Sequence, residues 1–302
     1  MQSEQVFNPE HYLKGRVALP PSVLSKPSEP FVYGGDISVL NGNSATLQIQ
    51  INDDSHFLVE QIAIFTGQQG IAQDAATVQI TDTSTSRSWS NTAVPLRDIA
   101  GLGMNPKYLQ HPNLLKPTTT LAVQITNNVG STQQFYVALI GRKIYGLEKF
   151  ESDFMSRRMW YQYVMNVPSL GASVNNQSAE LQVYNESDFM VFKLISQQLI
   201  NAVIGATGGA VSNEVLVSFK DTTTDKSLFN QPVAARLVIG AYAGEIVAVA
   251  NSWGYGLPEC IKKPWLIRRN GKITGYFTNL STTAISGGFN VVFEGIRIFD
   301  AA

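Results

Sequence analysis

The residues that could carry chemistry in this sequence are few and widely spaced. The three histidines, His11, His56 and His111, stand in unrelated contexts, and none has the spacing of a metal-binding or catalytic pair. The single cysteine, Cys260, has two lysines nearby that could lower its pKa, but no paired histidine to activate it. We therefore expect neither a metal centre nor a catalytic nucleophile at these positions.

Two acidic clusters are further candidates. Asp53 and Asp54, beside Asn52, could donate oxygen ligands to a hard cation such as Ca²⁺, although a solvated turn explains the same cluster. Asp82 and Asp221 each begin a short run of Thr and Ser residues, in which Asp and Thr side chains commonly bond local backbone N–H groups. We interpret Asp82 and Asp221 as turn residues.

Motifs of common enzyme classes are missing from the sequence. We find no nucleophile elbow, P-loop, Rossmann glycine pattern, paired-cysteine motif or EF-hand loop. Gly101 and Gly103 form a glycine turn without the strand and helix context of a nucleotide site. We predict no catalytic residues, no cofactor and no bound metal, and we expect that the protein is not an enzyme.

Aromatic residues suggest two kinds of contact surface. Trp160, Tyr161 and Tyr163 lie close together and could face lipid or another subunit. Alternatively, they could pack in the junction between two parts of the chain. Other aromatic side chains could stack on sugar rings if they are exposed, namely Trp89, Trp253, Tyr255 and Trp265.

The segments that must position these residues repeat along the chain. Four blocks of the first half return in the same order in the second half, at offsets that grow from 132 to 154 residues. The matched blocks are 44–62 with 178–194, 78–89 with 217–228, 112–127 with 264–279, and 135–145 with 289–299. Their common order predicts a tandem duplication.

Both halves have the pattern of antiparallel sheets. Hydrophobic and polar residues alternate, as at 46–51 and 121–125, which places them on opposite faces of a strand. Turn formers such as Asn270-Gly271 follow too closely for crossover helices, which excludes a parallel α/β fold. We predict an all-β fold of two tandem jelly-roll barrels, a double jelly roll, joined by a short helical linker. An immunoglobulin-like sandwich is the main competitor.

One glycine recurs inside the last strand of each half. Gly141 and Gly295 lie at matching places, where a missing Cβ would permit a bulge or a close approach of two backbones. The alternative is an ordinary glycine in an edge strand. We favour the bulge.

The predicted domain organisation has four parts. Residues 1–30, interrupted by prolines, form an extended N-terminal arm, and residues 31–147 form the first barrel. A linker at 148–168 contains a helix, which helical spacing of hydrophobic residues predicts over 147–164. The second barrel occupies residues 169–302.

Composition favours a chain that associates with itself. Charged residues make up 15% of the sequence, compared with a typical value of about 25%. Because like charges keep soluble monomers apart, a surface with so little charge is poorly protected from self-association. The formal net charge of -1, without long basic runs, argues against direct binding of nucleic acid.

No targeting or membrane segment is recognisable. The stretch 199–211 is too short and too rich in glycine to span a bilayer. The first residues lack the basic and then apolar pattern of a signal peptide, and a single cysteine cannot form an internal disulfide. We expect folding in a reducing cytoplasm.

The predicted chain has two jelly-roll-like halves, a linking helix and an N-terminal arm, and it lacks an active-site motif. This combination resembles a known protein family. The chain resembles the double-jelly-roll major capsid proteins of icosahedral bacteriophages that enclose a membrane, with the corticovirus and finnlakevirus groups closest in size. The resemblance implies barrels that stand upright on the shell, and a homotrimer that forms a pseudo-hexagonal capsomer of six barrels. Loops at one barrel end would face outwards, and the other end, with the arm, would face the internal membrane.

The same resemblance implies partners and a location. The partners are neighbouring capsomers of the same chain, other virion proteins such as penton and membrane proteins, and a nearby internal lipid membrane. The location is the virion capsid, after folding and assembly in the host cytoplasm. The alternative function is a jelly-roll carbohydrate-binding or receptor-binding module of a phage, which requires aromatic side chains exposed in a groove.

Overall fold

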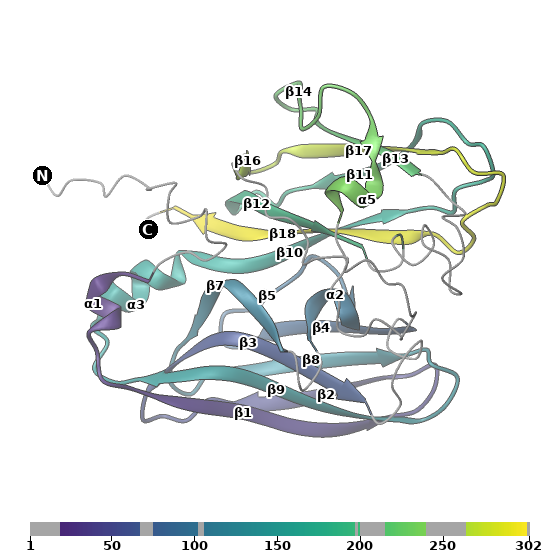
Figure 1. Cartoon of the computed structure of the whole chain (residues 1–302). Helices are drawn as coiled ribbons and strands as arrows, with labels where there is room; N and C mark the ends of the chain where they lie inside the picture. The colour runs from purple at the N-terminus through teal and green to yellow at the C-terminus, as the bar shows by residue number, and fades with distance from the viewer. Residues whose placement is uncertain are drawn as a thin grey trace, which may run out of the picture.

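The chain folds into two β-rich halves on either side of a short helix (Figure 1). The computed structural model describes residues 19–66, 75–101, 106–196, 199, 215–239 and 264–300. The first half contains α1 (Pro21–Leu24), β1 (Ser28–Val39), β2 (Ser44–Gln50), β3 (His56–Thr66), β4 (Ala76–Asp82), β5 (Arg87–Ser88), β6 (Val94–Pro95), α2 (Leu96–Ile99), β7 (Lys107–Leu115), β8 (Thr120–Asn127) and β9 (Gln133–Ile144).

After the linking helix α3 (Lys149–Ser156), the second half repeats this succession of strands. It contains β10 (Arg158–Val167), β11 (Gln177–Gln182), β12 (Ser187–Ile195), β13 (Val215–Asp221), β14 (Lys226–Ser227), β15 (Val233–Ala234), α5 (Ala235–Val238), β16 (Trp265–Ile267), β17 (Lys272–Asn279) and β18 (Phe289–Phe299).

Each half is a sandwich of two antiparallel sheets. In the first half the strand orders are β1-β9-β3-β7 and β2-β8-β4-β5, with β6 beside β4. In the second half they are β10-β18-β12-β16 and β11-β17-β13-β14, with β15 beside β13. The two orders are identical when β1 is matched with β10 and each later strand with its counterpart. Two packed sheets with this connectivity are jelly rolls, so the all-β double jelly roll predicted from the sequence is confirmed.

The core of each barrel lies between its two sheets. In β4 and β8, buried and partly exposed residues alternate, as expected for strands with one face towards the core. Strand β7 departs from this pattern, because Leu109, Gln110 and His111 are buried in succession. Both faces of β7 are covered, one by its own barrel and the other by β10 of the second barrel.

The paired glycines allow two backbones to approach closely. A Cβ on Gly141 would overlap the carbonyl oxygen of Leu58, and a Cβ on Gly295 would overlap that of Met190. Strand β3 has its bulge directly after Val59, the partner of Gly141, and β12 has a bulge at the equivalent place. The prediction of a bulge and close approach at these glycines is confirmed.

The linking helix is shorter than the sequence predicted. A capping box between Glu148 and Glu151 starts α3, which ends at Ser156. The rest of the predicted 147–164 helix is strand β10, which pairs along its whole length with β18. Aromatic and β-branched residues favour this strand, and tertiary pairing overrides the helical spacing. The second barrel therefore begins at Arg158, inside the predicted 148–168 linker.

The predicted N-terminal arm also ends earlier than expected. Strand β1 begins at Ser28, and α1 precedes it. The helix packs beside α3, where Val23 and Met155 share a small apolar cluster and Lys26 pairs with Glu151 at 3.0 Å. Residues 1–18 of the arm lie outside the described residues.

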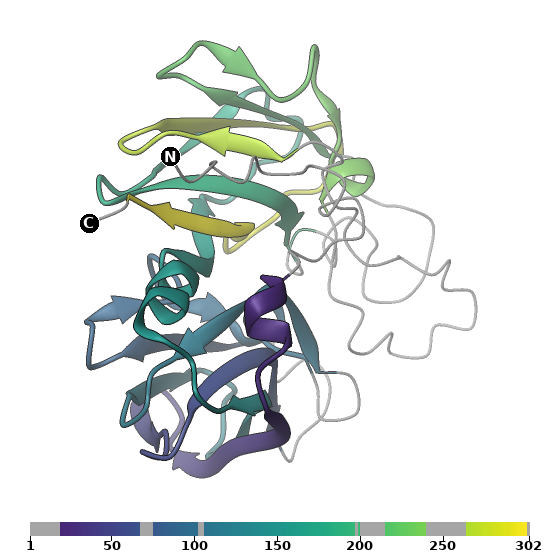
Figure 2. The ribbon, with the colours of Figure 1, turned by 90° about the vertical axis from the view of Figure 1, so that its left-hand side faces the viewer.

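The second barrel packs against one side of the first. Its sheet β10-β18-β12-β16 faces β5, β7 and α2 of the first barrel, as Figure 1 shows and the rotated view in Figure 2 supports. Strands β1 and β9 lie at the base of the first barrel, away from the second barrel (Figure 1).

Candidate functional site

The junction between the barrels is the richest cluster of buried polar groups in the described part of the chain. Its backbone contacts join the segment 89–91 of the first barrel to the edge of the second barrel's sheet. Ser90 forms a parallel bridge with Gln162 in β10. The N–H of Gln162 donates to the carbonyl of Trp89 at 3.0 Å, and the N–H of Asn91 donates to the carbonyl of Gln162 at 3.3 Å. The first barrel thus extends the second barrel's sheet by a short strand-like segment.

Asparagine side chains hold the same edge. The Asn91 amide accepts a hydrogen bond from the N–H of Val164 at 2.7 Å and donates to its carbonyl at 3.2 Å. The side-chain amide of Asn113, in β7, forms the same two bonds with Trp160. It accepts a hydrogen bond from the N–H of Trp160 at 2.7 Å and donates one to its carbonyl at 3.4 Å. Two amides therefore satisfy backbone groups of an edge strand that would otherwise be left unpaired.

A buried ion pair lies at the centre of the junction. Lys107 of β7 and Glu294 of β18 are both 0% exposed, and their charged atoms are 2.5 Å apart. Lys107 Nζ also donates to the carbonyl of Asp98 at 2.6 Å. Gln162 donates to the same carbonyl at 2.7 Å and to Glu294 at 3.1 Å. Two chain segments of each barrel thus meet in one polar network.

The environment sets the charge of this pair. Burial raises the pKa of Glu294, but the positive charges of Lys107 and Lys193 outweigh burial and hold the pKa below its usual value. Burial lowers the pKa of Lys107, and the Glu294 carboxylate opposes this shift. The opposite charges stabilise each other inside the protein, where either charge alone would be costly.

His111 is a buried neutral residue of β7. Burial, with help from the positive charge of Arg158, lowers its pKa to about 3. His56, at the start of β3, is only partly buried, and burial together with Lys116 lowers its pKa. The described residues contain no group of three side chains able to hold a metal ion. His11 lies outside them.

The acidic clusters serve local structure. Asp54 accepts hydrogen bonds from Lys143 at 2.7 Å and from Ser55 at 2.8 Å. The bond from Lys143 is the main cause of a pKa below the usual value of Asp54. Asp53 is exposed to solvent, so the structure favours the turn interpretation over a cation site.

Asp82 and Asp221 play the same part in their two barrels. Asp82 accepts hydrogen bonds from the backbone of Ser84 at 2.9 Å and from the hydroxyl of Thr85 at 2.8 Å. Asp221 accepts from the backbone of Thr223 at 2.9 Å and from the hydroxyl of Thr224 at 2.7 Å. The prediction that both residues form turns is confirmed.

The aromatic cluster belongs to the protein interior. Trp160 is buried against the first barrel, where its ring meets Trp89 at 6.3 Å in an edge-to-face contact. Tyr161 and Tyr163 point into the second core and are at most 1% exposed. The alternative that these three residues face lipid or another subunit is therefore wrong, and the alternative that they pack the junction is correct.

The candidate sugar-binding aromatics are not gathered in a groove. Trp89 is 1% exposed, and Trp265 is partly buried against the second core. Trp253 and Tyr255 lie outside the described residues, as does Cys260. The two candidates that the structure describes therefore do not form an exposed pair for stacking.

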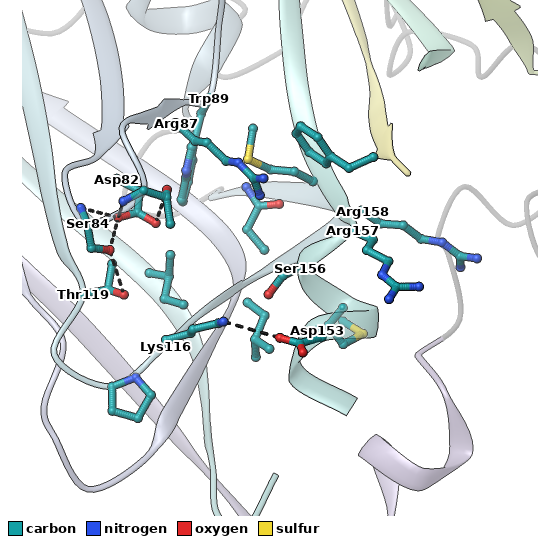
Figure 3. Close-up of a pocket in the computed structure, with 18 of the residues that line it drawn as sticks. Asp82, Ser84, Arg87, Trp89, Lys116, Thr119, Asp153, Ser156, Arg157 and Arg158 are labelled. Atoms are coloured by element: carbon teal, nitrogen blue, oxygen red, sulfur yellow. Dashed lines mark hydrogen bonds and ion pairs between the residues drawn. The ribbon is translucent and has the colours of Figure 1, made fainter. Parts of the chain in front are cut away.

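A cavity of about 680 Å³ opens beside the junction, between loops of the first barrel, α3 and the end of β18 (Figure 3). Several of its charged groups have partners in the protein. Lys116 pairs with Asp153 at 3.6 Å, and Asp82 is held in its turn. The guanidinium of Arg87 lies 4.1 Å from the ring centre of Phe299. The first of these contacts ties the first barrel to α3, and the last ties the first barrel to the second.

Sequence reasoning missed the residues that hold the junction. Glu294 carried a signal, because it is the single acidic residue in the apolar strand 289–299. Asn91, Asn113 and Gln162 carried none, since isolated amides are common on surfaces. Lys107 also resembled an ordinary surface lysine.

Comparisons with known proteins give distant structural likenesses. No family model and no curated protein matches the sequence. Among solved structures, the chain is similar to PNGase F, described as a glycosylasparaginase from Flavobacterium meningosepticum, with 11% identity and a TM-score of 0.38 over 90% of this chain and 97% of that one.

Two viral structures give similar values. The structure of Sulfolobus Turreted Icosahedral Virus aligns with 11% identity and a TM-score of 0.37 over 90% of this chain and 91% of that one. The PBCV-1 virus capsid aligns with 10% identity and a TM-score of 0.35 over 91% and 95%. Likenesses at this level do not assign a function, which has to be inferred from the chain's own geometry.

Proposed function

We propose that the protein is a structural major capsid protein that acts by self-assembly and not as an enzyme. The observation that carries this function is the junction. Two barrels with one strand order are locked side by side through backbone pairing, amide contacts and a buried ion pair. A chain built in this way is a rigid block with two similar units. Such a block can form the same contacts with each neighbouring copy, as a closed shell requires.

A tandem duplication explains why the units are similar in detail. Tyr33 accepts a hydrogen bond from the N–H of Asn52 at 3.1 Å, and Tyr163 accepts one from the N–H of Tyr184 at 2.9 Å. These residues occupy equivalent places in the two barrels. Repeated, partly buried hydrogen bonds of this kind support descent from one ancestral barrel.

Asparagines at the ends of β8 and β17 give a second repeated detail. Asn127 donates to the carbonyls of Val39 at 2.8 Å and Ser131 at 2.9 Å. Asn279 donates to the carbonyls of Gly171 and Thr283, each at 2.9 Å. Both side chains fasten two loops at the same end of their barrels.

In the assembly that we propose, three chains form a pseudo-hexagonal homotrimer of six barrels. Trimers then tile an icosahedral virion capsid, as in the bacteriophages that the sequence resembles. The low charge content of 15% suits surfaces that are covered on most sides by neighbours. Assembly in the host cytoplasm and contacts with penton and membrane proteins belong to the same proposal.

Proximity to an internal lipid membrane would involve the barrel ends or the arm. Trp160 and its aromatic neighbours are buried and cannot supply a lipid contact. No helix in the described ranges is long and apolar enough to cross a bilayer. Direct binding of nucleic acid is not part of the proposed function.

Multi-angle light scattering and electron microscopy test this function. We expect the purified chain to form trimers at micromolar concentration and hexagonal particles or shells at higher concentration. A chain that remains a monomer throughout, and forms no particles with its virion partners, would contradict a capsid function. A glycan array tests the sugar-binding alternative, which no described contact favours.

A further inference from the structure

The contact between the barrels uses two different surfaces. The first barrel supplies the segment 89–91, and the second barrel supplies the edge strand β10 with the outward face of its sheet. Each barrel has the same strand order, so each should possess both surfaces. Within the described residues of one chain, only one copy of each surface is used.

The unused receiving surface lies on β1. Phe31 pairs with Gly141, as Tyr161 pairs with Gly295, so Val32 of β1 is equivalent to Gln162 of β10. Among the strands that the structure describes, β1 pairs with β9 alone and lies at the edge of its sheet, as β10 does. Val32 is 54% exposed, whereas Gln162 is 0% exposed beneath the first barrel. An exposed edge strand is a ready site for pairing with another chain.

The face beside this edge combines apolar and polar side chains. Ile140 occupies the place of Glu294, since each precedes the glycine at a bulge. Tyr136, also in β9, is 50% exposed. The neighbouring Arg142 is already paired with Glu60 within the first barrel. The first barrel therefore has apolar Val32 and Ile140 where the second barrel has buried Gln162 and Glu294, and covering Val32 and Ile140 would remove apolar surface from water.

The unused docking surface is the segment 228–230. Trp89 donates its N–H to the carbonyl of Ile80 at 2.8 Å, and Leu228 donates to the carbonyl of Phe219, also at 2.8 Å. These equivalent bonds match the segment 89–91 with 228–230.

The docking asparagine is present in both segments. Asn91, which clamps the backbone of Val164, has its counterpart in Asn230, a solvent-exposed asparagine. The position of β10 that corresponds to Val164 is Gly34 in β1, and Gly34 is also exposed. The second barrel thus presents the same docking amide, and β1 presents the matching edge.

The two unused surfaces lie at opposite ends of the molecule. Strand β1 is at the base of the first barrel, and β14, directly before 228–230, is at the far end of the second barrel (Figures 1 and 2). Surfaces placed in this way cannot meet within one chain. They can meet head to tail between chains, and such contacts close into a ring when the rotation permits.

We propose that segment 228–230 of one chain docks on the β1 edge of a second copy, repeating between chains the contact that 89–91 makes with β10 within a chain. This inference rests on the proposed function, which supplies the closed trimer. Asn230 then clamps the backbone of Gly34, and the exposed side chain of Val32 is covered.

Site-directed cross-linking tests this interface on the full chain. In a Cys260→Ser background, Val32→Cys is combined with Gln231→Cys, which keeps the docking Asn230, and the assembled protein is treated with a short bismaleimide. We expect covalent dimers and trimers under denaturing conditions, because each chain supplies one cysteine to each neighbour. The matched control combines Gln231→Cys with Gln48→Cys, an exposed position on the other sheet, and should stay largely monomeric.

The outcomes separate the interface from the capsid function. Trimers that form in light scattering but give no cross-link above the control would overturn this interface and leave the capsid function standing. A chain that is monomeric at every concentration and gives no cross-link would overturn both.

A charge on the β1 face gives an independent measurement. Val32→Asp should raise the trimer dissociation constant at least about 10-fold, because docking would take a charged carboxylate out of water. Leu280→Asp makes the same change at a loop position that is 52% exposed, and it should leave assembly unchanged. Equal assembly of both variants, with native circular dichroism, would contradict docking at β1.

Discussion

Single buried polar residues give the junction its specificity. Asn91 and Asn113 each satisfy both backbone groups of one residue in β10, which fixes the register between the barrels. A purely apolar contact would allow the barrels to slide, whereas these amides are satisfied in one position only. His111 lies in β7, the strand that also contains Asn113, and burial favours its neutral form.

The titration of His111 predicts acid sensitivity. Its pKa falls from the usual 6.5 to about 3 in the folded chain, so the unfolded chain binds the proton first as the pH falls. The stabilising contribution is complete above pH 6.5 and is lost as the pH falls towards 3. Between pH 7 and pH 5 this single group should cost roughly 2 kcal/mol of unfolding free energy.

Urea unfolding at the two pH values measures this loss. His111→Gln cannot titrate and should show a smaller difference between pH 7 and pH 5 than the unmodified chain. His56→Gln is the control, because His56 stays partly exposed and should contribute less. An unchanged pH difference in His111→Gln would contradict the assignment.

At the scale of elements, the repeated bulge determines where each sheet can curve. The bulges in β3 and β12 bring a carbonyl oxygen against the Cα of Gly141 or Gly295, so neither position has room for a side chain. The glycine and the bulge recur together in the two barrels. A requirement of the backbone therefore explains both glycines without a catalytic or binding role.

Alanine substitution tests this requirement. Gly295→Ala forces β18 away from β12 and should lower the unfolding free energy by roughly 1–3 kcal/mol. Gly35→Ala is a matched control, because its new Cβ would meet only side-chain atoms of Leu47, the nearest at 3.1 Å. The loss in Gly295→Ala, measured by thermal or urea unfolding, should exceed that in the control; equal losses would show that the close approach is unimportant.

Strand β10 shows where local sequence information is insufficient. The sequence predicts a helix through residue 164, yet residues 158–167 form a strand because β18 pairs with every residue of β10. Local pattern alone cannot distinguish the two, since both faces of this strand are buried and the alternation of polar residues is lost.

For the whole molecule, the buried ion pair couples the barrels. Lys107→Met leaves Glu294 charged in the interior and should cost about 3–5 kcal/mol of unfolding free energy. Adding Glu294→Gln removes that charge and should restore most of the loss. A double-mutant cycle from urea unfolding measures the coupling, and additive single losses would show that the two residues act independently.

The sequence by itself determined the all-β class, the repeated blocks, the two turn aspartates and the paired glycines. These features depend on neighbours along the chain, such as strand alternation and turn chemistry, and the period of the repeat is visible without coordinates. The sequence also showed little charge and no catalytic motif.

Only the tertiary structure decided which residues hold the barrels together and which surfaces remain open. Lys107 and Glu294 are far apart in sequence, and their pairing follows from how two sheets pack. The same packing buries Gln162 and leaves its counterpart Val32 exposed. Equivalent positions in a repeated chain acquire different environments because each barrel has a neighbour on one side only, and that asymmetry is a property of the folded molecule.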